Sequence, residues 1–139
     1  MISICDTGPL VAYLDRREPH HPWAANLFTQ VLAPMLTCEA VIAETSYFLR
    51  EGGVDVELLF EMIERGSLTI DFNLSQHWQR VRTLMGRYQQ MDLADACVVA
   101  MSEAHRRCQV LTLDAKDFSV YRRNDRQVIE FVSPPSMRR

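Results

Sequence analysis

Short apolar runs alternate along this chain with longer segments in which apolar residues recur every three or four positions. An apolar run bounded by Gly, Pro, Asn or Asp predicts a strand, and the three-to-four spacing predicts an amphipathic helix. We therefore expect strands at residues 2–5, 67–72, 110–113 and 128–132. We expect helices at residues 10–14, 20–32, 38–49, 54–65, 75–90 and 93–107.

The order of these segments predicts the fold class. Helical segments separate the strands, and connections of that length allow the crossovers that parallel strands need. The pattern therefore predicts a three-layer α/β/α sandwich with a mostly parallel sheet. The chain has 139 residues, of which 47% are hydrophobic and 24% charged, as is typical of one globular domain. We expect a single domain at residues 1–133 and a frayed basic tail at residues 134–139.

The charged residues leave two interpretations of the surface open. The net charge of -3 does not by itself indicate a nucleic-acid-binding protein. Lys116, however, is the only lysine among 15 basic residues. The planar guanidinium of arginine can donate two parallel hydrogen bonds to a phosphate, which the ammonium of lysine does less well. The arginine clusters therefore fit a solvated surface and a phosphate-binding surface about equally well.

The same sequence predicts the compartment. No apolar stretch approaches the roughly 20 residues that cross a bilayer, and the N-terminus lacks the features of a signal peptide. The four cysteines form no C-x-x-C pair, so we expect them to be reduced and buried. We therefore expect a cytoplasmic protein without membrane contact.

Acidic residues stand at the expected carboxyl ends of two strands. Asp6 follows residues 2–5, and Asp114 follows residues 110–113. In open parallel sheets, the loops beyond these ends form binding sites. Two carboxylates brought together repel each other, so their proximity predicts a cation between them. Each acid could instead cap the N-terminus of a helix, a common role for Asp.

Three further acids lie in or beside the expected helices. Glu44 falls on the border of an apolar stripe, from which it could reach a crevice or form a salt bridge at the core edge. Asp95 is surrounded by apolar residues, so its charge needs a metal ion or an arginine. Asp92 stands three residues earlier, where we expect it to cap the helix.

Neighbouring polar residues extend this set of candidates. Asp114 and Asp117 share the spacing of the preceding pair of aspartates, so in each pair one acid could cap a helix while the other faces the site. Thr7 and Thr112 stand beside the strand-end acids. Their hydroxyls could orient those carboxylates or form ordinary turn hydrogen bonds.

Other common chemistries do not fit the sequence. The four histidines show no zinc-binding pattern, no serine or cysteine lies in a nucleophile elbow, and no phosphate-binding G-x-x-x-x-G-K-[ST] loop occurs. The remaining ligands are carboxylate oxygens, which suit hard, hydrated cations such as Mg²⁺ or Mn²⁺.

Four segments, taken in order, resemble the PIN-domain ribonucleases. They are DTGPL at residues 6–10, AVIAETSYFL at residues 40–49, MDLADACVVA at residues 91–100 and VLTLDAKDFSVY at residues 110–121. More closely, they resemble the VapC-type toxins of bacterial toxin–antitoxin pairs, over residues 2 to about 132. Each motif is short, but all four in this order form a strong signal.

The resemblance implies a fold, a site and partners. It implies a parallel sheet of four or five strands and an acidic quartet that binds Mg²⁺ or Mn²⁺. The implied quartet is Asp6, Glu44, Asp95 and Asp114, with Asp117 and Asp92 as further candidates and Thr112 as the hydroxyl before the last acid. It also implies a homodimer that a small cognate antitoxin inactivates by occupying the groove.

The resulting hypothesis is metal-assisted hydrolysis of RNA. A cation held by Asp6, Asp95 and Asp114 would polarise the phosphoryl oxygens, while Glu44 steers the attacking water or a second cation. Arginines would contact the RNA backbone, which positions RNA without reading its sequence. Our candidates for this contact are Arg80, Arg82, Arg87 and Arg122.

Two alternatives compete with this hypothesis. A phospho-accepting receiver domain also gathers acids around Mg²⁺, but it needs a paired acid motif after its first strand and a late lysine. Here only Asp6 follows the first strand, and Lys116 lies between two acids. The other alternative is a PIN fold that acts on DNA or serves as an inactive binding protein, and the intact acidic quartet disfavours an inactive protein.

Overall fold

A computed structural model describes residues 1–137, in which five strands form one sheet in the order β3-β2-β1-β4-β7. The strands are β1 (Ile2–Cys5), β2 (Met35–Thr37), β3 (Leu68–Ile70), β4 (Cys108–Leu111) and β7 (Phe131–Val132). Each neighbouring pair in this sheet is parallel. The parallel sheet predicted from the sequence is confirmed, with five strands.

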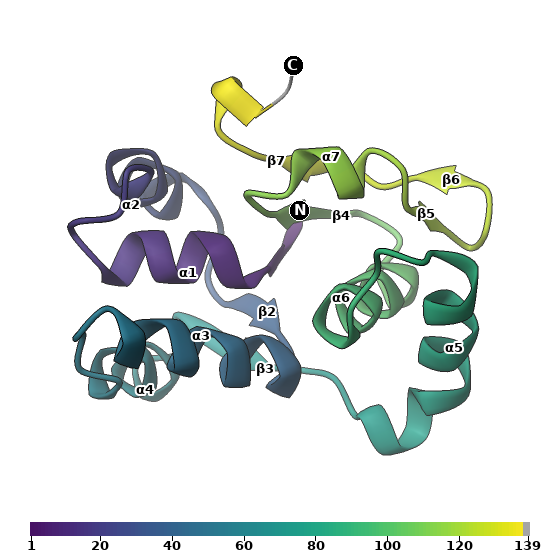
Figure 1. Cartoon of the computed structure of the whole chain (residues 1–139), viewed down its shortest axis with the longest axis horizontal. Coiled ribbons are helices and arrows are strands. Elements are labelled where there is room, and N and C mark those ends of the chain that lie inside the picture. Colours follow the sequence, from purple (N-terminus) through teal and green to yellow (C-terminus); the bar gives the residue numbers. More distant parts are fainter. Residues whose placement is uncertain (138–139) are drawn as a thin grey trace.

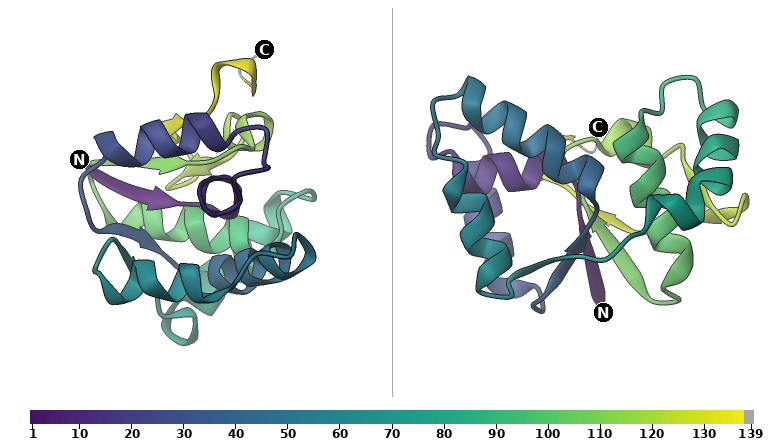
Figure 2. Two further views of the ribbon diagram at one scale, coloured as in Figure 1. Left: turned by 90° about the vertical axis from the view of Figure 1, so that its left-hand side faces the viewer. Right: turned by 90° about the horizontal axis from the view of Figure 1, so that it is seen from below.

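Helices cover both faces of the sheet. They are α1 (Thr7–Leu14), α2 (His21–Gln30), α3 (Glu39–Glu51), α4 (Glu57–Glu64), α5 (Leu74–Arg87), α6 (Leu93–Ala104) and α7 (Ala115–Phe118). Figures 1 and 2 show α1 to α4 on one side and α5 and α6 on the other. Right-handed crossovers explain this, because the path from β1 to β3 and the return to β4 run in opposite directions across the sheet. The predicted α/β/α sandwich is confirmed.

Strand β2 was not predicted from the sequence. It has three residues, all buried, and it pairs with β1 on one side and β3 on the other. Three residues are too few for a periodic signal. The strand forms because β1 and β3 provide hydrogen-bond partners for its backbone N–H and C=O groups, which is a tertiary effect.

The single strand predicted at residues 128–132 is wrong, because the structure divides this segment. Strand β6 (Gln127–Val128) pairs antiparallel with β5 (Arg122–Arg123), and only β7 joins the main sheet. Asn124 and Asp125 turn the hairpin with φ values of 50° and 65°, as a tight hairpin turn requires. The turn therefore takes Val128 out of the sheet.

The described part of the chain closes with a short turn. Pro135–Met137 form a 3-10 turn, while residues 138–139 of the predicted frayed tail lie outside the described residues, so the tail stays a prediction. Within residues 1–137, none of the helices combines the length and apolar character needed to span a bilayer.

The neighbouring strands β1 and β4 position the loops that carry the acids. Cys5 lies opposite Leu111, and the Asp6 N–H donates a hydrogen bond to the Leu111 carbonyl at 3.0 Å. The segments that follow β1 and β4 therefore leave the sheet side by side. A β-carbon at Gly8 would lie 2.6 Å from the Leu113 Cγ, so glycine permits this close approach.

Candidate active site

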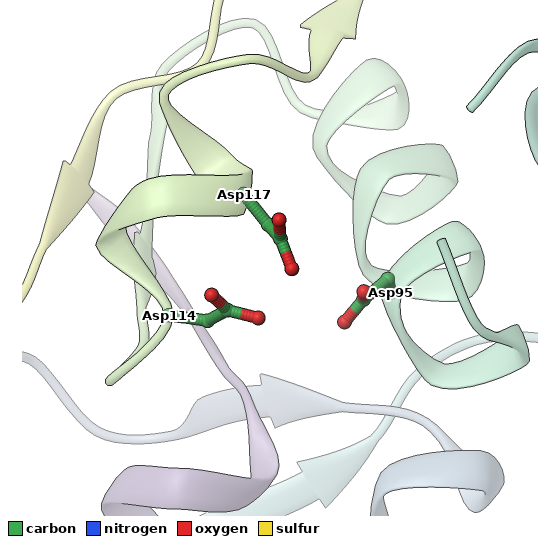
Figure 3. Close-up of side chains that lie close together, drawn as sticks. All are labelled: Asp95, Asp114 and Asp117. Atoms are coloured by element: carbon green, nitrogen blue, oxygen red, sulfur yellow. The ribbon is translucent and has the colours of Figure 1, made fainter. Parts of the chain in front are cut away.

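Three carboxylates converge beyond the ends of β1 and β4. Asp95 comes from α6, Asp114 from the turn after β4, and Asp117 from α7 (Figure 3). One oxygen from each lies within 4.8 Å of the others. Asp95 is 8% exposed, and the other two are half-buried. Carboxylate oxygens at this spacing are suitable ligands for one hard cation.

The Thr112 hydroxyl connects Asp6 to this cluster. It donates a hydrogen bond to Asp6 Oδ2 at 2.8 Å and accepts one from the Asp114 N–H at 2.9 Å. Asp6 Oδ1 accepts a further hydrogen bond from the Thr7 N–H at 2.8 Å, which caps α1. Thr112 is fully buried and thus orients one carboxylate while it shapes the turn that carries the other. Both roles left open for this hydroxyl are therefore present.

Glu44 and Asp92 hold the neighbouring helices in place. Glu44 Oε1 accepts a hydrogen bond of 2.8 Å from the Thr7 hydroxyl, which joins α3 to the start of α1. Asp92 Oδ1 accepts one of 2.8 Å from the Asp95 N–H, so it caps α6 as predicted. Asp6, which caps α1, combines the capping and site positions that the sequence left as alternatives.

An open cavity of about 400 Å³ lies among most of these acids. Six of the lining residues are acidic, namely Asp6, Glu18, Glu44, Asp92, Asp95 and Asp114. The others are Thr7, Gly8, Val11, Phe48 and Leu113. Among the described residues that line it, none is Arg, Lys or His. The cavity therefore repels a phosphate unless a cation is present.

Burial makes the charged forms of these acids costly. Loss of water raises the pKa of Asp6 to about 6 and that of Asp95 to about 7. Burial and a hydrogen bond with Asp117 raise the pKa of Asp114 to about 6. Burial also raises the pKa of Glu44, to which the negative charge of Asp92 contributes. A group of acids with raised pKa values in one cavity is typical of a functional site.

Two residues at the site were missed from the sequence. Glu18 lines the cavity from the segment between α1 and α2, where no periodic signal predicts its direction. The Tyr121 hydroxyl donates a hydrogen bond of 2.8 Å to Asp95 Oδ2, and its side chain is fully buried. The spacing of Phe118 and Tyr121 indicates a buried pair, and a buried phenol needs an acceptor. The sequence alone does not identify that acceptor.

None of the four arginines proposed to contact RNA lines the cavity. Arg80 donates two hydrogen bonds to Glu103, at 2.9 and 2.7 Å, and one to Asp125 at 2.9 Å. Arg87 also pairs with Asp125, at 2.8 Å. Both arginines therefore bind carboxylates of their own chain.

The other two arginines make different contacts. Arg122 Nη1 donates hydrogen bonds to the backbone carbonyls of residues 119–121. The Arg82 guanidinium lies over the ring of Trp78, 5.2 Å from its centroid. An RNA contact by any of the four arginines stays a prediction.

Comparison with known proteins places the chain in a family. Residues 3–124 match the PIN domain, which is most of the chain. The chain belongs to the PIN-domain family. A relative of this PIN domain is Ribonuclease VapC26 of Mycobacterium tuberculosis (strain ATCC 25618 / H37Rv), with 28% identity over 123 residues. The match covers 86% of this chain and 91% of the relative. The resemblance found in the sequence is confirmed.

Proposed function

We propose that this PIN domain is a metal-dependent endoribonuclease and the toxin of a toxin–antitoxin pair. The observation that carries the proposal is the convergence of Asp95, Asp114 and Asp117, of which Asp95 and Asp114 line, together with Asp6, a cavity that no described cationic side chain lines. Similarity to a protein named Ribonuclease VapC26 supports RNA as the substrate.

The residues of the site fit a divalent cation. The donors are carboxylate oxygens, without the thiolates or imidazoles that zinc prefers. Burial raises the pKa values of Asp6, Asp95 and Asp114, so their ionised forms would be stabilised by a nearby positive charge. Mg²⁺ or Mn²⁺ would provide that charge. Asp95, Asp114 and Asp6 would hold the ion, with Asp117 and Asp92 as additional candidates.

In the proposed reaction, the chain's own residues orient the reactants. When bound, the ion supplies positive charge that polarises the scissile phosphodiester and activates water for attack. Thr112 holds Asp6 and the Asp114 turn in a fixed relation before RNA arrives. The Thr7 hydroxyl holds one carboxylate oxygen of Glu44 at the cavity wall, and Glu44 would orient the attacking water from there.

Exposed apolar side chains support protein partners for this PIN domain. Tyr47 and Phe48 on α3 are 59% and 50% exposed, and Leu58 and Phe60 on α4 are 40% and 50% exposed. Large apolar side chains that remain exposed are candidates for contact with another protein. We propose that a small antitoxin and a second copy of the chain are the partners, and co-expression with a small protein encoded immediately upstream tests the first of them.

The decisive experiment compares the aspartate variants with the unchanged protein. Asp95→Asn and Asp6→Asn keep the side-chain shape but remove the charge, so cleavage of a mixed RNA pool with Mn²⁺ should fall below detection. Mn²⁺ should also raise the melting temperature of the unchanged protein, and either variant should lessen that rise. Cleavage should stop in EDTA.

A matched control uses an aspartate outside the cavity. Asp71 is exposed and does not line the cavity, so Asp71→Asn should cleave RNA as the unchanged protein does. Single-stranded DNA of equal length tests the DNA-acting alternative. If purified Asp95→Asn retained metal-dependent cleavage, the assignment of Asp95 to the active site would be wrong.

A further inference from the structure

One oxygen of Asp95 is held from behind by a side chain that does not line the cavity. The Tyr121 hydroxyl donates a hydrogen bond of 2.8 Å to Asp95 Oδ2, and the phenol is fully buried. Tyr121 approaches from the segment after α7, while Asp95 sits in the first turn of α6. This hydrogen bond leaves the Oδ1 atom of Asp95 as the oxygen without a tyrosine donor.

The surroundings of Tyr121 fix the position of its hydroxyl. Its ring packs edge-on against Phe118 and Tyr88, with centroids 5.1 Å away in both cases. Its N–H donates a hydrogen bond of 3.0 Å to the carbonyl of Asp117, another acid of the cluster. The same segment therefore carries a candidate ligand and the donor that orients the Asp95 carboxylate.

A fixed donor has a specific effect on a metal-binding carboxylate. A carboxylate rotates about its bond to the β-carbon, and freezing that rotation when an ion binds costs free energy. A donor already bound to one oxygen removes much of this rotation in advance. Changing such outer partners of metal ligands typically weakens metal binding by about 10–100-fold.

We propose that Tyr121 is a positioning residue that orients the Asp95 carboxylate for a divalent cation. The proposal rests on the proposed function only in that Asp95 holds the ion. Tyr121 does not touch the substrate in this proposal. Its hydroxyl holds Asp95 Oδ2, so that the carboxylate faces Asp114 and Asp117.

The test replaces Tyr121 with Phe, which keeps the ring and removes the hydroxyl. Mn²⁺ binding is measured without RNA, from the electron paramagnetic resonance signal of free Mn²⁺. Tyr121→Phe should raise the dissociation constant by about 10–100-fold. RNA cleavage should fall at limiting Mn²⁺ and recover most of its rate at saturating Mn²⁺, because the ligands themselves remain.

Tyr88→Phe is the matched control. Tyr88 belongs to the same aromatic cluster, but its hydroxyl accepts a hydrogen bond from the Arg122 N–H at 3.1 Å instead of binding an acid. The variant should lose some thermal stability and bind Mn²⁺ as the unchanged protein does. A general loosening of the cluster would instead weaken binding in both variants.

The outcomes separate this proposal from the proposed function. Unchanged Mn²⁺ affinity in Tyr121→Phe, or an equal loss in Tyr88→Phe, overturns the role of Tyr121 and leaves the nuclease proposal standing. Weakened Mn²⁺ binding in Tyr121→Phe alone supports the role even if the unchanged protein cleaves no RNA. Absence of Mn²⁺ binding by the unchanged protein overturns both proposals.

Discussion

At the scale of single residues, the site gathers acids that would each be easier to ionise in water. Asp95 is 8% exposed and Asp6 is 7% exposed, and burial raises the pKa of both. Thr112 and Tyr121 partly offset this cost by donating hydrogen bonds to the two carboxylates. The negative charge that remains is what a bound cation would neutralise.

The raised pKa values predict how metal-free stability changes with pH. The pKa of Asp95 rises from 3.8 to about 7 on folding, so the native state retains a proton that the unfolded chain releases. This contribution to stability is fully present below about pH 4 and is lost as the pH rises through 7. Asp6 and Asp114 act in the same direction, with pKa values of about 6.

Urea unfolding in EDTA at a series of pH values from 4.5 to 8 measures this effect. The free energy of unfolding of the unchanged protein should decrease more steeply across this range than that of Asp95→Asn, whose amide does not titrate. If the free energy of unfolding changed equally with pH in the two proteins, the raised pKa of the buried Asp95 would be contradicted.

At the scale of elements, two turns carry the acids and depend on their close approach. The turn after β1 holds Asp6, and the turn after β4 holds Asp114. Gly8 and Leu113 meet between them, at a distance that leaves no room for a β-carbon. Packing between the turns therefore sets the relation between the two acids, in addition to the hydrogen bonds of Thr112.

Gly8→Ala should separate these turns. The added methyl overlaps Leu113 at its inner carbon atoms, which cannot swing away easily, and overpacking of this kind costs about 1–3 kcal/mol. We expect a lower melting temperature and weaker Mn²⁺ binding. Gly86→Ala in α5 is the control, because nothing lies within 4 Å of its position and alanine favours helix. It should leave Mn²⁺ binding unchanged, and similar losses in both variants would contradict the explanation.

At the scale of the whole molecule, an ion-pair network fastens the C-terminal hairpin to α5 and α6. Arg80 binds Glu103 of α6 and Asp125 at the hairpin turn, and Arg87 binds Asp125. The hairpin directly follows Tyr121. The network therefore joins distant parts of the chain next to the segment that carries Tyr121.

Arg80→Met should show how much this network contributes to the free energy of unfolding. Glu103 is 12% exposed in its side chain and would lose its charged partner. Charged hydrogen bonds of this kind contribute roughly 1.5–3 kcal/mol, and partial exposure of Arg80 places the expected loss at the low end. Urea unfolding measures it. Arg82→Met is the control, because Arg82 is exposed and pairs with no described carboxylate.

The same two variants also test the predicted RNA contacts. An arginine that contacts phosphate contributes to the salt dependence of RNA binding, so its loss should make that dependence shallower. If Arg80 serves the fold alone, Arg80→Met should lose stability without changing the salt dependence of RNA binding. A shallower dependence in Arg82→Met would support Arg82 as a contact to the RNA backbone.

Local patterns were sufficient to predict the fold class and to place Asp6 directly after β1, whereas β4 ends at Leu111, two residues earlier than predicted, so Asp114 lies in the turn beyond it. The Asp6 and Asp114 positions follow from apolar runs that end in polar turns, and the burial of Asp95 follows from its apolar neighbours. The cap at Asp92 was also predicted, because a capping interaction joins residues only three positions apart. Each of these features depends on neighbours close in the sequence.

Only the tertiary structure decided which distant residues meet. Strand β2 forms because β1 and β3 flank it, and the hairpin turn divides the segment in which the sequence predicted one strand. Tyr121 reaches Asp95 across 26 positions, and Thr112 reaches Asp6 across 106. The physical reason is that the spacing of apolar residues in a segment indicates which of its side chains are buried. The hydrogen-bond partner of a buried side chain depends instead on how separate elements pack.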